Sequence, residues 1–93
     1  MNDLQKLQAI YNHIRDNGTL CAKLPGSMGG IWGADTYDLG PFTAQLCDDG
    51  STQAVRHGDF LAWSTYGREV EYRSGCDATG LDTMYQQVFA EDA

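Results

Sequence analysis

Apolar residues recur at helical spacing near the start of the chain and form one stripe. This stripe predicts an amphipathic helix over residues 3–16. Asn2 or Asp3 can cap its N-terminus, and Gly18 can adopt the left-handed conformation that ends many helices. The stripe consists of Leu4, Leu7, Ile10, Tyr11 and Ile14.

Polar and apolar residues alternate between residues 31 and 73, and glycine-containing turns interrupt them at short intervals. This pattern predicts four or five short antiparallel strands in a meander. A further short strand over residues 19–22 can precede the glycine-rich segment 25–30. The expected strands are 31–37, 42–47, 52–56, 60–65 and 68–73, with turns at 48–51, 57–59 and 66–67.

A second stripe at helical spacing predicts a helix over residues 79–90. Thr79 and Asp82 resemble a capping box at its start. Two helices on one face of one antiparallel sheet give an α+β fold, and 93 residues make a single domain, residues 1–93. The stripe consists of Leu81, Met84, Tyr85, Val88 and Phe89.

Acidic residues outnumber basic ones along most of the chain. Thirteen Asp and Glu stand against six Lys and Arg, so the formal net charge is −7. Such a surface repels nucleic acid and anionic membranes, and it attracts basic grooves on proteins. Although the chain has aromatic side chains that can stack on bases, we expect no direct binding to nucleic acid and no membrane contact.

The cysteines and the N-terminus indicate a cytoplasmic protein. Cys21, Cys47 and Cys76 are odd in number and widely spaced, which argues against a disulfide framework or a closed zinc site. We expect reduced thiols, while one disulfide with one free thiol stays open. The first residues lack the basic start and apolar run of a signal peptide, and the longest apolar stretch, 60–63, is too short to span a bilayer.

The motifs for cofactor and metal binding are incomplete, so we expect neither. Residues 26–30 are rich in glycine, but the Lys and Ser or Thr of a phosphate-binding loop do not follow them. Residues 48–53 supply oxygen ligands without the alternation, central glycine and terminal Glu of a calcium loop.

Two patterns suggest catalysis, and neither is specific. Glu69 and Glu71 share one face of a predicted strand about 6.5–7 Å apart, a separation found in inverting glycosidases. A thin domain of this size leaves little room for a sugar cleft. A Cys–His pair with an orienting carboxylate is conceivable, with His13 or His57 as the imidazole. We predict that the protein is not an enzyme.

The acidic surface itself is the best functional signal. Strand carboxylates and acidic turns can form a negative array on the sheet face opposite the helices. Such an array can occupy a groove built for phosphates through the same Arg and Lys contacts, with exposed aromatic residues as anchors. The candidate protein-binding residues are Asp35, Asp38, Asp48, Asp49, Asp59, Glu69 and Glu71, with Trp32, Tyr37 or Tyr66 as anchors.

In size, charge, glycine content and lack of an enzyme motif, the chain resembles small inhibitors encoded by phages and mobile elements, namely anti-CRISPR proteins and DNA mimics. The resemblance lies in composition over the whole chain and in no particular motif. It implies a stoichiometric inhibitor that occludes a basic nucleic-acid-binding protein or complex of the host, such as a CRISPR effector. We expect a monomer or a homodimer.

Two other classes stay open. A structural or assembly protein, for instance a phage accessory subunit, would self-associate through the apolar stripe of one helix, over residues 81–89 or 4–14. A concentration-dependent homo-oligomer would favour it. A small enzyme using Cys and His would show rapid stoichiometric labelling of one native thiol by a mild electrophile.

Overall fold

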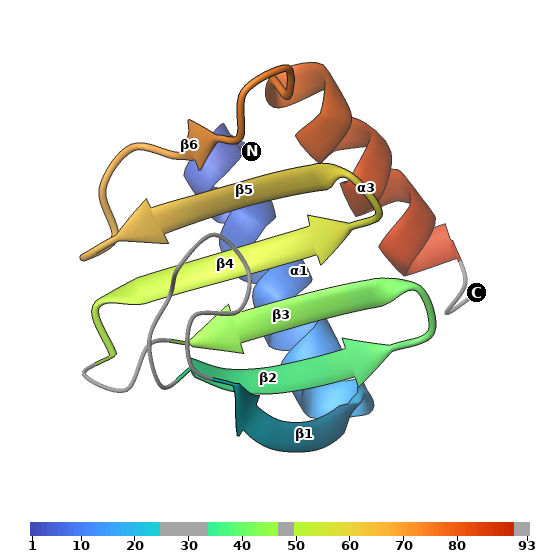
Figure 1. Cartoon of the computed structure of the whole chain (residues 1–93). Helices are drawn as coiled ribbons and strands as arrows, with labels where there is room; N and C mark the ends of the chain where they lie inside the picture. The colour runs from blue at the N-terminus through green and yellow to red at the C-terminus, as the bar shows by residue number, and fades with distance from the viewer. Residues whose placement is uncertain (25–33, 47–49, 91–93) are drawn as a thin grey trace.

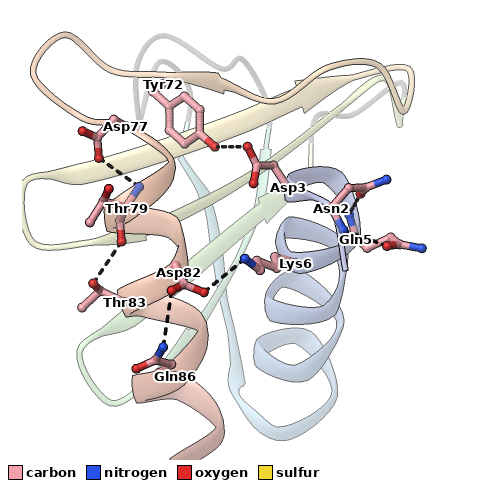
Figure 2. A network of polar contacts seen from close by, with 10 residues as sticks. All are labelled: Asn2, Asp3, Gln5, Lys6, Tyr72, Asp77, Thr79, Asp82, Thr83 and Gln86. Carbon is pink, nitrogen blue, oxygen red and sulfur yellow. Dashed lines mark hydrogen bonds and ion pairs between the residues drawn. The ribbon is translucent and has the colours of Figure 1, made fainter.

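The computed structural model describes residues 1–24, 34–46 and 50–90, and these form one α+β layer structure (Figure 1). Both helices cover the same face of an antiparallel sheet, behind the strands in Figure 1 and in front of them in Figure 2. The elements are α1 (Asp3–Asn17), β1 (Thr19–Leu24), β2 (Ala34–Leu39), β3 (Phe42–Leu46), β4 (Thr52–His57), β5 (Phe60–Thr65), β6 (Glu71–Tyr72) and α3 (Ala78–Ala90).

The sheet is a meander, because its strands lie side by side in chain order from β1 to β6 and every neighbouring pair is antiparallel. The predicted α+β class, antiparallel sheet and two flanking helices are therefore confirmed. The sheet has six strands where the sequence predicted four or five. The difference arises because the short N-terminal segment also pairs with β2, for example Leu20 with Tyr37, with a shift in register between Cys21 and Leu24.

The last predicted strand, 68–73, is wrong in length. Only β6 pairs with β5, through Ala62 with Tyr72 and Trp63 with Glu71. The residues before β6 are held by a turn, because the Arg68 amide donates to Thr65 O at 3.1 Å and Arg68 O accepts from Ser64 Oγ at 2.7 Å. These bonds draw the start of the segment away from the regular ladder.

The start of α3 also differs from the prediction. The carboxylate of Asp77, rather than a Thr79–Asp82 capping box, caps this helix: Asp77 Oδ1 accepts from the amides of Thr79 at 3.0 Å and Gly80 at 3.3 Å. Asp82 pairs instead with Lys6 of α1 at 3.1 Å. At α1 the predicted cap is confirmed, since Asn2 and Gln5 form a capping box.

The core lies between the helices and one face of the sheet. Small residues at the centre of this face, Ala44 and Ala62, are fully buried and let the helices approach the strands closely. Larger side chains from both helices fill the remaining space. The buried helix residues are Leu7, Ile10, Tyr11, Ile14, Leu81, Met84 and Val88. Among the described residues, no helix is long and apolar enough to cross a membrane.

Gly18 ends α1 through its small size rather than through a left-handed backbone. Its φ is −91°, and a Cβ at this position would lie 2.5 Å from both Asp38 O and Ile14 O. Because both obstacles are main-chain atoms, we expect Gly18→Ala to lower the free energy of unfolding by about 2–3 kcal/mol. Urea unfolding measures this change. An unchanged stability would contradict the close contact between the end of α1 and β2.

A polar network joins the start of α1 to β6 and α3 on the helix side of the molecule (Figure 2). The Tyr72 hydroxyl donates to Asp3 Oδ2 at 3.2 Å, and the Lys6 ammonium contacts Asp82 Oδ1 at 3.1 Å. Asp77 is engaged in capping α3. These three carboxylates therefore have structural partners within the fold.

The Tyr72–Asp3 contact predicts a loss of stability at high pH. Burial, followed by the negative charge of Asp3, raises the pKa of Tyr72 to about 12. An unfolded tyrosine has a pKa of about 10, so the resulting stabilisation is complete below that pH and is lost as the pH rises towards 12. We expect the free energy of unfolding to fall less steeply over this range in Tyr72→Phe than in the wild type.

Urea unfolding of both proteins at several alkaline pH values measures the two slopes. Tyr11 is present in both proteins, and burial raises its pKa as well, so its contribution cancels in the comparison. Parallel slopes would show that the Tyr72 proton is held no more tightly in the folded state than in the unfolded chain.

Candidate protein-binding surface

The acidic residues of β2 point to opposite faces of the sheet. Tyr37 packs against the core under the helices, and Asp35, two residues earlier, lies on the same face. Both are half-buried. Asp38 lies on the other face, where it accepts a hydrogen bond from Thr43 Oγ1 at 3.0 Å. We call this the open face because neither described helix covers it (Figure 1), although Thr36, Gln45 and Ala54 on it are buried. Because side chains alternate between the two faces of a strand, Asp35 and Tyr37 lie on one face of β2 and Asp38 lies on the other.

The carboxylates on the open face are far apart. Asp38 lies on β2 and Glu71 on β6, and four strand spacings place their backbones about 19 Å apart. Arg56 of β4 lies on the same face between them, because it is in register with Thr43 and Leu61. The open face therefore carries charges of both signs instead of an uninterrupted negative array.

The structure brings three of the predicted residues to one region, the connection between β5 and β6 and the start of β6. These are Tyr66, Glu69 and Glu71, and all three are exposed. Asp59 lies in the turn at the other end of β5. Trp32, Asp48 and Asp49 lie outside the described residues.

Tyr66 has an unusual backbone and an exposed ring. Its φ is +55°, its side chain is 70% exposed, and Gly67 follows with φ +67°. Turns with two positive φ values favour Asn-Gly, and a left-handed tyrosine costs about 1–2 kcal/mol. The Tyr66 amide is fixed by a 2.6 Å hydrogen bond to Ser51 O. The fold thus holds an aromatic ring in solvent despite a backbone cost.

One charged side chain lies over this ring, and a second charged residue follows it in the chain. The guanidinium of Arg68 lies 5.8 Å from the centroid of the Tyr66 ring. Glu69 follows in the same connection, and among the residues that the structure describes its carboxylate has no hydrogen-bond or ion-pair partner. An exposed carboxylate without an internal partner is available to a cation on another molecule.

Trp63 completes the surface. It lies on the open face of β5, and its indole Nε1 donates to Glu71 Oε2 at 3.0 Å. The ring is half-buried and packs against Ala54 and Leu61. Trp63 was not among the predicted anchors, because its hydrogen bond to Glu71 depends on the register between β5 and β6. We call Trp63, Tyr66, Arg68, Glu69 and Glu71 the β5–β6 surface.

Two neighbouring hollows lie by the start of α3, and Cys76 lines one of them. One of about 460 Å³ is lined by Cys76, Asp59 and Arg73, and a neighbouring one of about 410 Å³ includes His57. The half-buried Cys76 is a free thiol and donates to Asp59 O at 3.6 Å. No group of three or more His, Cys, Asp or Glu within the described segments is placed to hold a metal ion.

The exposed tyrosine provides a stability test. Asn adopts the left-handed backbone more readily than Tyr, so Tyr66→Asn relieves strain while it removes the cation–π contact with Arg68. We expect the free energy of unfolding to stay unchanged or rise by up to about 1 kcal/mol. Chemical denaturation measures it, with Tyr66→Phe as the control that keeps both the ring and the strain. A marked destabilisation by Asn would mean that the Tyr66 side chain supports the fold.

Comparison of the chain with protein-family models, with curated proteins and with solved structures finds no match in any of the three.

Proposed function

We propose that this protein is a non-enzymatic, protein-binding inhibitor that occludes the basic nucleic-acid-binding surface of a host protein or complex, as anti-CRISPR proteins and DNA mimics do. The β5–β6 surface makes the contact. The observation that carries the proposal is Tyr66, which is 70% exposed at φ +55°. Residues held in costly backbone conformations concentrate at functional sites, and Tyr, Trp and Arg dominate the binding energy of interfaces.

Charge supports a basic partner. The net charge of −7 attracts a positive surface over long range, and Glu69 and Glu71 then contact individual Lys or Arg side chains. The mixed charges on the rest of the open face favour one local contact over a carboxylate array spread across the whole sheet. The mode of inhibition is therefore steric: one bound molecule covers the partner's groove for nucleic acid.

The helix stripes support this choice over assembly through a helix. The stripe residues Leu7, Ile10, Leu81 and Met84 are at most 1% exposed, because they pack against the sheet. A second copy of the chain cannot reach them without unfolding. The described helices thus use most of their apolar stripes inside the fold, while the stripe residues Leu4, Tyr85 and Phe89 are half-buried.

A capture experiment at two salt concentrations tests the proposal. The immobilised chain is exposed to a bacterial lysate in about 0.1 M and about 1 M salt, between which the Debye length falls from about 10 Å to about 3 Å. We expect a basic nucleic-acid-binding protein to be retained at low salt and released at high salt. The purified partner should lose its nucleic acid when one equivalent of the chain is added. A partner that binds the chain and keeps its nucleic acid would refute occlusion.

A further inference from the structure

The backbone at the outer edge of β6 points away from the neighbouring strand β5. The Arg73 amide donates to Leu61 O at 3.0 Å, so Leu61 and Arg73 form a hydrogen-bonded pair. Such pairs alternate along an antiparallel ladder, and the next pair, Ala62 with Tyr72, is therefore a non-hydrogen-bonded pair. The N–H and C=O of Tyr72 consequently point away from β5, where the described residues place no further strand (Figure 1).

The side chains around this edge alternate as they do in a complete strand. Val70 is 8% exposed and Tyr72 packs against the core, so both face the helices. Glu69 and Glu71 are exposed and two residues apart. Only the last two residues of this pattern pair with β5. At this edge the N–H and C=O of Tyr72 point away from β5, the side chains of Val70 and Tyr72 pack against the core, and Glu69 and Glu71 are exposed at alternate positions.

We infer that the partner binds by adding an extended segment to the outer edge of β6, with Lys or Arg at alternate positions facing Glu69 and Glu71. This inference rests on the proposed function, because it specifies how the β5–β6 surface holds its partner. Main-chain hydrogen bonds to Tyr72 supply affinity, as in other cases of strand addition. The alternating Lys or Arg side chains fix the register of the added segment against β6, because side chains on one face of a strand repeat every second residue.

A short synthetic peptide with Lys at every second position and Thr or Val between them is the probe. A peptide of the same composition with its Lys residues consecutive has the same charge and is the matched control. We expect only the alternating peptide, and not the control peptide, to slow hydrogen exchange at the Tyr72 amide, by at least about tenfold. Methylating the peptide nitrogens that face β6 should weaken its binding by at least about tenfold, since each methyl group removes a donor.

The outcomes separate strand addition from the proposed function. Charge-dependent binding that leaves Tyr72 exchange unchanged, or that survives methylation, would overturn strand addition and leave the β5–β6 surface as the contact. Equal protection by both peptides would overturn the alternating register. If neither peptide binds, strand addition is refuted, while occlusion is decided by the capture experiment with the complete partner.

Discussion

Phe42→Ala should lower the free energy of unfolding by about 3–5 kcal/mol, the largest stability loss that we expect from a single substitution. Phe42 is 2% exposed on the helix face of β3, and its ring centroid lies 4.7 Å from that of His57 on β4. Truncation removes the apolar contacts of the ring and leaves a cavity that the surrounding strands fill only in part. A domain of this length has a total stability of roughly 5–14 kcal/mol, so the variant should be close to unfolding.

Urea unfolding followed by circular dichroism measures the loss, and two further variants keep the result interpretable if Phe42→Ala fails to fold. Phe42→Leu retains most of the apolar volume and should cost less than Phe42→Ala. Tyr66→Ala removes an aromatic ring from solvent and should change stability by less than about 0.5 kcal/mol. Equal losses for Phe42→Ala and Tyr66→Ala would contradict the placement of the core between the sheet and the helices.

The double reversal Glu69→Lys with Glu71→Lys should weaken binding to the captured partner by at least about a hundredfold. Each reversal replaces an attraction with a repulsion at close range, and like charges facing each other across an interface cost several kcal/mol. Glu69 and Glu71 are exposed, so their reversal should leave the fold intact. Titration of the purified partner, together with urea unfolding of the variant, separates the loss of affinity from a loss of stability.

The matched control is the double reversal Asp16→Lys with Asp59→Lys. It changes the net charge by the same amount, and both aspartates are exposed, outside the β5–β6 surface. We expect a reduction in affinity of less than about tenfold for this control, because it alters only the long-range attraction. Equal losses for the two double variants would show that total charge, rather than this surface, determines binding.

The strands and helices were largely predictable because each has a local signal. The flanking turns predicted at 57–59 and 66–67 placed the strand 60–65 at the observed ends of β5, and the apolar stripes placed both helices within one residue at each end. β6 was overestimated because its alternation continues through residues that the Arg68 turn withdraws from pairing. That turn depends on the hydrogen bond that Ser64 Oγ donates to Arg68 O. The spacing of apolar residues in the sequence does not indicate such a bond.

The candidate site was less predictable because it depends on register and on backbone angles. The turn at 66–67 was expected, but Tyr is not a residue that favours positive φ, so the strain at Tyr66 left no signal in the sequence. The contact of Trp63 with Glu71 requires the pairing of β5 with β6. The separation of Asp35 from Asp38 was readable, since Asp35, Tyr37 and Leu39 are spaced by two residues and share one face.

The most direct test of the β5–β6 surface follows the indole N–H signal of Trp63 by NMR during titration with the captured partner. This proton lies in the 3.0 Å hydrogen bond to Glu71 Oε2, so it reports any cation that draws the carboxylate away. Trp63→Phe identifies the signal against that of Trp32. We predict that the Trp63 indole signal and the amide signals of Tyr66, Glu69 and Glu71 shift on binding. A bound partner that leaves these four signals in place would contradict the assignment of the surface.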